Sequence, residues 1–237
     1  MKPTAEFDFF AATYDEDIDR ALFVSGENKD YFAQARVAWL AEHLQESFEQ
    51  PQSAMDYGCG IGRSAVLLRE RLGVKSVVGL DVSARSLEVA RSRYGSNGLR
   101  FRSFEEYSPQ EEIDIVYCNG VFHHIPPVER AGAVRYIARC LRPGGLFALW
   151  ENNPWNPGTR YVMSHCSFDR YAITLTPPEA ASLLRSEGLQ ILCSDFLFIF
   201  PRALKFLRLV EPWLSRFPLG AQYMVLCRKA AKYHAGS

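Results

Sequence analysis

Short apolar segments alternate with stretches of helical spacing through the middle of the chain, beginning near residue 54. The apolar segments are typical of buried strands, and between them apolar residues recur every three or four positions. Strands that alternate with helices build βαβ units, in which a mainly parallel sheet carries helices on both faces. The pattern therefore predicts an α/β fold. The predicted strands of this part are 53–57, 74–80, 99–102, 113–118 and 146–150.

Length and composition favour a single domain of this kind. The 237 residues are 48% hydrophobic and 23% charged, which is average for a globular protein with one core. Two apolar runs at 189–199 and 223–227 raise the predicted sheet to seven strands, and a helical insert lies between them. We divide the single domain, residues 1–237, into a helical cap at 1–50, a core at 51–151, and a substrate-side loop, insert and last strands at 152–237.

The charges of the chain balance, with 27 Lys and Arg residues against 27 Asp and Glu residues. This balance argues against a protein that binds long nucleic acids through their phosphates, because such binding normally requires a basic excess. No segment approaches the roughly 18 consecutive apolar residues of a membrane span. Residues 1–8 turn acidic where an export signal would be apolar, so we expect a cytoplasmic protein.

The cysteines predict neither disulfides nor a metal site. They are scattered, without a C-x-x-C pair and without the spacing of zinc ligands. We therefore expect reduced thiols and no bound metal. The cysteines are Cys59, Cys118, Cys140, Cys166, Cys193 and Cys227.

Three glycines follow the first predicted strand in the segment Asp56-Tyr57-Gly58-Cys59-Gly60-Ile61-Gly62. Such a turn lets a ligand approach the backbone, and the helix that follows offers free N–H groups and a positive dipole end. Dinucleotide-binding proteins have G-x-G-x-x-G, which would require glycine at Arg63, so the loop favours a nucleotide ligand without a pyrophosphate. Asp81 ends the second strand, where an acid can reach both hydroxyls of a ribose.

This loop and Asp81, together with Asn119–Ile125 and Leu141–Gly145, resemble the class I S-adenosylmethionine-dependent methyltransferases, specifically their small-molecule branch. The resemblance covers residues from about 54 to 151. It extends to Phe7–Asp15, which is similar to the F-D-x-x-A-x-x-Y-D segment of the N-terminal cap in that family. The resemblance implies a Rossmann-like sheet, with S-adenosylmethionine as the cofactor and S-adenosylhomocysteine as its product.

The resemblance also implies roles for individual residues. The glycine loop would hold the methionine part of the cofactor, Asp81 the ribose, and Asn119 with Gly120 the segment beneath the sulfonium. Family members often carry an acid just after the third strand to receive the adenine amino group, whereas this chain has Ser103 and Phe104 there. We expect Ser103 to accept that hydrogen bond and Phe104 to pack on the ring. The expected cofactor-binding residues are Tyr14, Asp56, Gly58, Cys59, Gly60, Gly62, Asp81, Val82, Ser103, Phe104, Asn119 and Gly120.

Two histidines, His123 and His124, follow the fourth predicted strand at the edge of the sheet where open α/β folds bind ligands. Imidazole titrates near neutral pH, so either side chain could act as a general base toward a hydroxyl or an amine. We predict a catalytic role for this pair. The alternative is that one of them only hydrogen-bonds the loop.

Aromatic and polar residues at the end of the fifth predicted strand form a candidate wall for the methyl acceptor. The alternative is a loop in which the Asn and Pro residues make turns. Residues of the N-terminal part are expected to close over the same site. The predicted acceptor pocket consists of Tyr31, Arg36, Trp150, Glu151, Asn152, Asn153 and Trp155.

Residues 201–217 carry basic and apolar residues on different faces of a predicted amphipathic helix, with a kink expected at Pro212. Arg202, Lys205 and Arg208 recur three positions apart. One interpretation is a lid packed over the substrate pocket, and we favour this ordinary packing. The other is an interfacial helix that makes weak contact with a membrane surface.

These features together predict a methyltransferase that uses S-adenosylmethionine and acts on a small molecule. Oxygen or nitrogen is the favoured methyl acceptor, and carbon is also compatible with the sequence. One alternative is an enzyme with a lipid-like or membrane-associated acceptor, and another is a non-catalytic subunit that binds S-adenosylmethionine. A nicotinamide dehydrogenase is disfavoured by Arg63. The sequence leaves open the acceptor molecule, the atom methylated, the pathway and the oligomeric state.

Overall fold

The computed structural model describes residues 22–47, 49–95, 98–166, 169 and 171–231. Two predictions, the segment Phe7–Asp15 and the cofactor contact of Tyr14, lie outside these residues.

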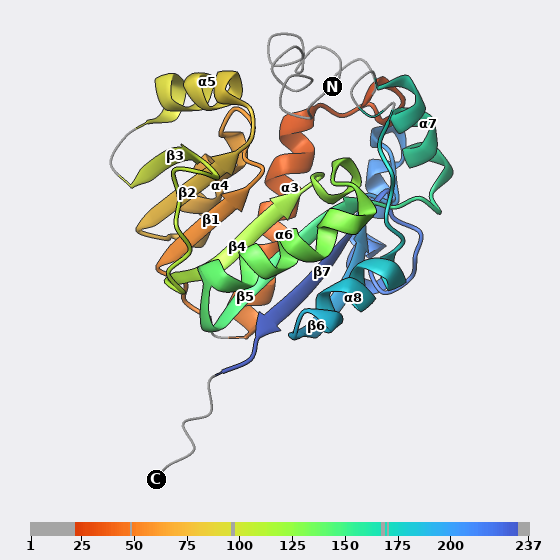
Figure 1. The fold of residues 1–237 in the computed structure, drawn as a ribbon. Coiled ribbons are helices and arrows are strands. Elements are labelled where there is room, and N and C mark those ends of the chain that lie inside the picture. The colour runs from red at the N-terminus through yellow and green to blue at the C-terminus, as the bar shows by residue number, and fades with distance from the viewer. Residues whose placement is uncertain (1–21, 48, 96–97, 167–168, 170, 232–237) are drawn as a thin grey trace.

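A single seven-stranded sheet forms the centre of the fold, as the sequence predicts (Figure 1). Its strand order is β3-β2-β1-β4-β5-β7-β6. All neighbouring pairs from β3 to β5 are parallel, whereas β7 runs antiparallel to both β5 and β6. The strands are β1 (Ser53–Tyr57), β2 (Ser76–Asp81), β3 (Leu99–Ser103), β4 (Ile113–Asn119), β5 (Leu141–Asn152), β6 (Leu189–Leu197) and β7 (Gln222–Lys229).

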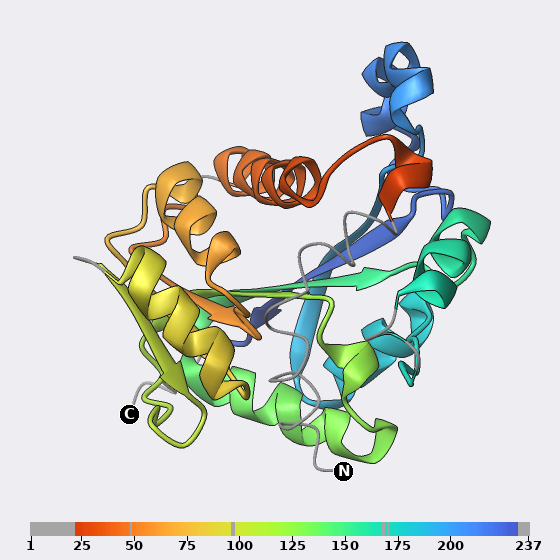
Figure 2. The same ribbon diagram turned by 90° about the horizontal axis from the view of Figure 1, so that it is seen from above.

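Helices cover both faces of the sheet (Figure 2). Alternate residues of each strand point to opposite faces, so Ala54 and Ile115 belong to one hydrophobic core cluster, and Met55 and Val116 to another. Helices α3, α4 and α5 pack in the first cluster, and α6 and α8 in the second. The α-helices of these layers are α3 (Lys29–Glu46), α4 (Arg63–Leu72), α5 (Ala84–Tyr94), α6 (Pro127–Cys140) and α8 (Pro177–Ser186). The other helices are η1 (Leu22–Ser25), η2 (Phe122–His124), α7 (Pro157–His165), η4 (Arg202–Val210) and α9 (Glu211–Leu214).

The described part of residues 1–50 differs from the predicted cap. Helix α3 begins at the N-cap Asn28, whose side chain accepts a hydrogen bond from the Tyr31 backbone N–H. Its Val37 and Leu40 are fully buried in the same core cluster as the sheet. Helix α3 therefore packs on the sheet as one of the helical layers of the core.

The insert before the last strand also differs from its prediction. Residues 202–214 form the 3-10 helix η4 followed by the short helix α9. The backbone breaks at Leu204, with φ −108° and ψ 25°, while Pro212 lies in the first turn of α9, where its missing N–H is not needed. Within Arg202–Val210, all of which the structure describes, no side chain is fully buried. Leu207, Val210 and Leu214 are half-buried, so the segment packs only in part, and the choice between a lid and an interfacial helix stays open. Figure 2 shows this segment standing out from the body of the molecule.

Among the described residues, no helix is both long enough and apolar enough to cross a membrane.

Candidate active site

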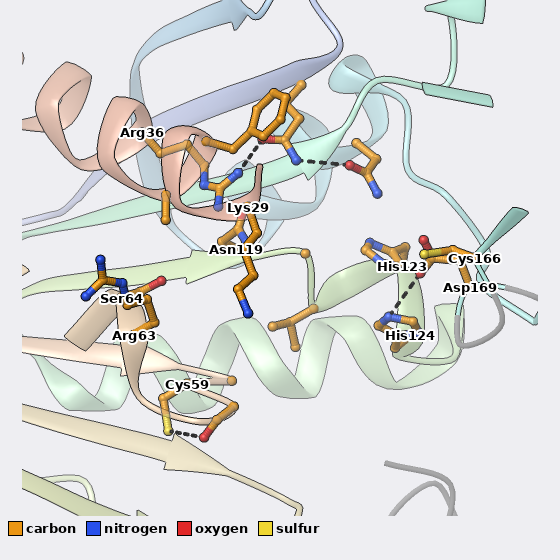
Figure 3. A pocket seen from close by; sticks show the side chains of 18 of the residues that line it. Lys29, Arg36, Cys59, Arg63, Ser64, Asn119, His123, His124, Cys166 and Asp169 are labelled. Carbon is orange, nitrogen blue, oxygen red and sulfur yellow. Dashed lines mark hydrogen bonds and ion pairs between the residues drawn. The ribbon is translucent and has the colours of Figure 1, made fainter. Parts of the chain in front are cut away.

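A cavity of about 1230 Å³ opens at the carboxyl ends of the parallel strands β1, β2 and β4. Ligands of open α/β sheets bind at this edge, where the connecting loops diverge. Pockets for one small molecule occupy roughly 300–1,000 Å³, so this cavity has room for a cofactor and an acceptor together. Figure 3 shows Cys59 at one end of the cavity and His123, His124 and Asp169 at the other.

The three glycines after β1 have different roles. Gly58, Gly60 and Gly62 all have positive φ values, of 77°, 51° and 87°. A Cβ on Gly58 would lie 2.3 Å from Val121 Cγ2, and one on Gly62 would lie 2.8 Å from Phe101 Cζ. A Cβ on Gly60 would meet no described heavy atom within 4 Å. Gly58 and Gly62 therefore permit close packing, whereas Gly60 exposes its backbone to the cavity.

Asp81, at the end of β2, ties the glycine turn to the next helix. Its Oδ2 accepts a hydrogen bond from Gly60 N at 2.7 Å, and its Oδ1 accepts one from Ser83 N at 2.9 Å. The carboxylate is buried but lines the cavity. Because a carboxylate oxygen can accept more than one hydrogen bond, this orientation is compatible with contact to a diol.

Two buried oxygen acceptors on the cavity wall receive no hydrogen bond from the part of the chain that the structure describes. Asp56 Oδ2 and Asn119 Oδ1 have no hydrogen-bond partner among the described residues, although both side chains belong to the wall. Burial and the neighbouring Asp81 raise the pKa of Asp56 to about 7. Buried acceptors of this kind are costly unless a ligand or water supplies N–H or O–H groups. The site is therefore suited to a ligand that carries an amino group.

Arg36 of α3 places a positive charge beside these acceptors (Figure 3). Its Nε donates to the hydroxyl of Tyr117 at 3.1 Å, and its Nη1 donates to Oε1 of Gln222 at 2.8 Å. The described residues give Nη2 no hydrogen bond, and the charge of Arg36 partly offsets the rise in the Asp56 pKa. A guanidinium next to two oxygen acceptors provides complementary partners for the carboxylate and ammonium of an amino acid.

Most of the predicted cofactor residues lie together on this wall. Gly62 does not line the cavity, since its Cα side faces Phe101 and Ala90. Ser103 does not line it either. Its hydroxyl accepts a hydrogen bond from Glu106 N in the turn after β3. Those that line the cavity are Asp56, Gly58, Cys59, Gly60, Asp81, Val82, Phe104, Asn119 and Gly120.

An acid, Glu105, lies close to the position after β3 for which the sequence predicted only Ser103 and Phe104. It is exposed, lies two residues after the end of β3 and lines the cavity beside Phe104. Phe104 packs edge-on against Tyr57, with ring centroids 4.9 Å apart. The signal was present in the sequence, because Glu105 directly follows the segment in which an acid was sought.

A buried ionic cluster forms the other end of the cavity. Oε2 of Glu151 lies 2.6 Å from Nδ1 of His123, and its Oε1 accepts a hydrogen bond from Phe122 N at 2.7 Å. Asp169 Oδ1 lies 3.3 Å from Nε2 of His123 and 3.5 Å from Nε2 of His124. Both nitrogens of His123 therefore face carboxylates, and Asp169 lies between the two histidines.

The two histidines differ in their protonation. Burial opposes the charged form of His123, but Glu151 and Asp169 outweigh it and raise its pKa to about 10. Burial and the charge of His123 lower the pKa of His124 to about 4. Near neutral pH these shifts favour an imidazolium at His123, hydrogen-bonded to Glu151 and ion-paired with Asp169, and a neutral ring at His124. If the pair supplies a base, these shifts favour His124 for that role.

Asp169 is a site residue that the sequence analysis missed. It lies in the connection between α7 and α8, far from the histidines in sequence. Arg130 of α6 fixes the loop that carries His123 and His124, because its Nε donates hydrogen bonds to the Phe122 and Ile125 carbonyls. Its Nη2 donates to the Ile173 carbonyl, which fixes the chain just after Asp169. No local pattern around Asp169 indicated this arrangement.

The predicted acceptor wall is found only in part. Tyr31, Arg36 and Asn152 line the cavity, whereas the side chain of Trp150 is fully buried in the core. Asn153 donates hydrogen bonds to the carbonyls of Pro218 and Gly220, so it ties two loops together and makes no wall. The predicted pocket residues that do not line the cavity are Trp150, Glu151, Asn153 and Trp155.

Two groups of side chains have the residue types and spacing to hold a metal ion. His123, His124 and Asp169 form one, and His43, Cys193 and Asp195 the other, with ligand atoms within 4.8 Å of one another in each. In both, ion pairs between histidine and carboxylate already account for the arrangement, including the 2.9 Å contact of His43 with Asp195. We therefore assign no metal to either group.

Comparison with known proteins identifies the middle of the chain. Residues 54–145 match the family model of the methyltransferase domain. Trans-aconitate 2-methyltransferase of Methylobacterium radiotolerans is 29% identical over 137 residues, which cover 57% of this chain and 52% of that protein. Methyltransferase GfsG of Streptomyces halstedii is 33% identical over 119 residues, covering 46% of this chain and 42% of that protein. The chain thus spans about half the length of these curated relatives.

Solved structures extend the similarity of fold to nearly the whole chain. An S-adenosylmethionine-dependent methyltransferase from Thermotoga maritima has a TM-score of 0.64 at 19% identity, covering 96% of this chain and 99% of that chain. Another from Mesorhizobium loti has a TM-score of 0.56 at 21% identity, covering 75% of this chain and 90% of that chain. At these identities the likeness establishes the fold.

Proposed function

We propose that the chain is a class I S-adenosylmethionine-dependent methyltransferase, which transfers a methyl group from S-adenosylmethionine to a small-molecule acceptor. The match of residues 54–145 to the methyltransferase domain, the similarity to trans-aconitate 2-methyltransferase and the shared fold support this proposal. We propose an oxygen or nitrogen atom as the acceptor, and carbon as a less favoured one. The division of the single domain into a core at 51–151 and an acceptor side at 152–237 is part of this proposal.

The observation that carries the proposal is the pair of unsatisfied buried acceptors, Asp56 Oδ2 and Asn119 Oδ1, beside the glycine turn. The methionine part of the cofactor carries an ammonium and a carboxylate. The ammonium would satisfy the two acceptors, and Nη2 of Arg36 would bind the carboxylate. Arg36 thus moves from the predicted acceptor pocket to the cofactor side of the site.

The remaining cofactor contacts follow the same wall. The open backbone at Gly60 would pass beneath the methionine part, and Asp81 would bind the ribose hydroxyls. Val82 and Phe104 would pack on the adenine, and Glu105 would receive its amino group in place of Ser103. Contact of the cofactor with Tyr14 stays a prediction, because that residue lies outside the described part of the chain.

The cofactor supplies an activated methyl group, so the protein has to position the acceptor and remove its proton. We assign His124 as the general base that removes this proton. A pKa of about 4 makes it a weak base, yet an oxygen or nitrogen that receives a methyl group becomes cationic and far more acidic than the free acceptor. We assign His123 and Asp169, which line the cavity beside His124, and Glu151, which lies behind His123, to the positioning of His124.

Titration calorimetry with S-adenosylmethionine and S-adenosylhomocysteine tests the cofactor assignment. We expect binding by the natural chain and a loss of at least about tenfold for Asp81→Asn, as a hydrogen-bonded charge is removed. Glu88→Gln is the matched control, because this exposed residue of α5 lies off the cavity wall and the variant should bind normally. If Asp81→Asn binds as tightly as the natural chain, the cofactor assignment is wrong.

Formation of S-adenosylhomocysteine with a panel of phenols, amines and carboxylates tests the activity itself. Carboxylates are included because a relative is a trans-aconitate methyltransferase. Turnover with one class identifies the acceptor atom. Binding of the cofactor without turnover on any member would instead favour the alternative of a non-catalytic subunit.

A further inference from the structure

Residues 201–219 form a projecting lobe with large apolar side chains in contact with solvent. The exposed fractions are 66% for Phe206, 83% for Leu209 and 76% for Trp213. Phe217 and Leu219 are also more than half exposed. Figure 2 shows the η4 segment of the lobe extending beyond the helices and strands of the body. A cluster of this kind on a polar protein surface indicates an interaction site.

The lobe is held firmly at its base, so the exposure is a property of its fold. Ser215 is buried, and its carbonyl accepts a hydrogen bond from Phe196 N at 2.7 Å. Asn153 donates to the carbonyls of Pro218 and Gly220, which fixes the end of the lobe to β5. Asp195, buried in β6, forms an ion pair with Arg216 at 3.3 Å.

The accessible charge on the lobe is positive. Arg202, Lys205 and Arg216 are exposed. Glu211 is the only acid in residues 201–219 by sequence, and its Oε1 accepts a hydrogen bond from Phe200 N at 2.8 Å. Arg208 is turned to the body, where it pairs with Glu27 at 2.9 Å. The solvent face of the lobe therefore combines aromatic and aliphatic groups with bases.

We propose that the projecting lobe binds the surface of an anionic lipid bilayer. Trp213, Leu209 and Phe206 enter the interface between headgroups and acyl chains, and the exposed bases contact the lipid phosphates. Charge decides against a second copy of the chain as the occupant, because a symmetric contact would place the bases of one lobe opposite those of the other. The binding stands independently of the proposed methyl transfer.

The projecting lobe adjoins the cavity of the proposed active site. Phe198, Ile199, Phe200 and Pro201, which lead into the lobe, line the cavity, as does Arg208. A bilayer bound at the lobe would therefore lie near this side of the cavity. An amphiphilic molecule leaving the bilayer would reach the pocket by a short path along an apolar wall.

Vesicle flotation tests the proposal with the full chain. One set of vesicles contains only phosphatidylcholine, and the other equal parts of phosphatidylcholine and phosphatidylglycerol. We expect at least about tenfold stronger binding to the anionic vesicles at low salt, and weaker binding as salt is added. The emission of Trp213 should shift to shorter wavelength on binding, and Trp213→Phe should remove most of that shift.

Matched variants separate the lobe from the rest of the surface. Leu209→Ser with Trp213→Ser should abolish flotation, and Arg202→Gln with Lys205→Gln should remove the preference for anionic vesicles. Val128→Ser is the control, since Val128 is equally exposed but lies on α6. Unchanged circular dichroism and thermal unfolding confirm that each variant folds.

Three outcomes would overturn the proposal. The first is absence of binding to anionic vesicles at low salt. The second is equal binding to both kinds of vesicle, or binding that the lobe variants retain. The third is a dimer in light scattering that the Leu209→Ser, Trp213→Ser variant disrupts while vesicle binding is absent, which would assign the lobe to a second copy.

Discussion

At the scale of single residues, Asp56 couples the proposed cofactor to pH. Its pKa is raised to about 7, mainly by burial and then by Asp81, so near neutral pH part of the protein carries an uncharged Asp56. An ammonium beside the carboxyl favours the charged form. Affinity for S-adenosylhomocysteine should therefore rise about tenfold between about pH 5.5 and about pH 7.5, as measured by calorimetry.

Asp56→Asn and Glu88→Gln distinguish this coupling from other titrations. The Asp56→Asn variant should bind weakly and with little dependence on pH, because its side chain does not ionise over this range. The Glu88→Gln variant should keep the natural profile, because Glu88 is exposed and lies off the cavity wall. A pH-independent affinity of the natural chain would contradict the assignment of Asp56 to the ammonium.

His123 and His43 make the stability of the fold depend on pH in the alkaline range. Carboxylate partners raise the pKa of each to about 10, against an ordinary value near 6.5. Their stabilising effect is thus fully present below about pH 6.5 and is lost as the pH rises through about 10. Over this interval the linkage gives a loss of about 3 kcal/mol for each histidine, to be discounted at His43 for solvent screening. The free energy of unfolding in urea should therefore fall by on the order of 3–5 kcal/mol between about pH 6.5 and about pH 9.5.

His123→Gln should show a smaller fall over the same range. His124→Gln is the matched variant, because the pKa of His124 is lowered and its deprotonation is complete before the range begins. An equal slope for His123→Gln and the natural chain would show that His123 is not charged in the folded protein.

Contacts that follow from the order of the strands were predictable, whereas contacts made through long loops were not. Asp56 and Asp81 end adjacent parallel strands, so the strand pattern alone predicts that they share an edge. Asp169 reaches His123 through a loop whose path depends on Arg130 and on the packing of α8. The protonation of the two histidines depends on that same carboxylate, so sequence alone could not tell which of them is neutral.

At the scale of elements, different glycines of the turn after β1 serve folding and cofactor binding. Gly58→Ala places a Cβ 2.3 Å from Val121, on a backbone with φ of 77°, and should destabilise the fold by about 1–3 kcal/mol. Gly60→Ala meets no described neighbour within 4 Å and should cost only about 1 kcal/mol of backbone strain. Its main effect should be weaker cofactor binding, because its methyl group enters the cavity.

Thermal unfolding and calorimetry on the two variants test this separation. The Gly58 variant should melt clearly lower than the Gly60 variant, which should lose more cofactor affinity than its small change in stability explains. A Gly60→Ala protein that binds S-adenosylhomocysteine normally would show that the cofactor does not pass over this backbone.

Periodicity predicted the elements correctly where neighbours along the chain pack together. The strands from β1 to β5 and the helices between them follow the predicted order because each crossover returns to the same sheet. Helix α3 was assigned to a cap because it precedes the first strand, yet Val37 and Leu40 pack on the sheet. For residues 201–217, the spacing indicated two faces but not what either face would contact. The structure leaves Leu207 and Leu214 half-buried, and it exposes Phe206, Leu209 and Trp213 to solvent.

At the scale of the whole molecule, the proposed site is assembled from two parts of the chain with separate duties. The glycine turn, Asp81 and Asn119 come from the part with sequence relatives. Asp169 comes from the part beyond residue 145, which the family model does not match. Cofactor binding and acceptor chemistry should therefore respond to different substitutions.

Asp169→Asn is the substitution that tests this division of duties. It removes the charge between His123 and His124 without touching the glycine turn, so turnover should fall by at least about tenfold while affinity for S-adenosylhomocysteine stays within about twofold. The pH dependence of turnover should also shift, because Asp169 supports the protonated form of His123. A purely structural role would lower stability and leave that profile in place.

Glu151→Gln is the second variant of a double-mutant cycle with Asp169→Asn, because Glu151 contacts the opposite nitrogen of His123. If the two carboxylates act through one imidazolium, the double variant should lose much less activity than the product of the two single losses. Additive losses would mean that Asp169 acts on the acceptor directly and is a catalytic residue. A tenfold loss of cofactor affinity in Asp169→Asn would instead show that the cofactor extends into the histidine end of the cavity, and that the two parts of the chain share a single duty.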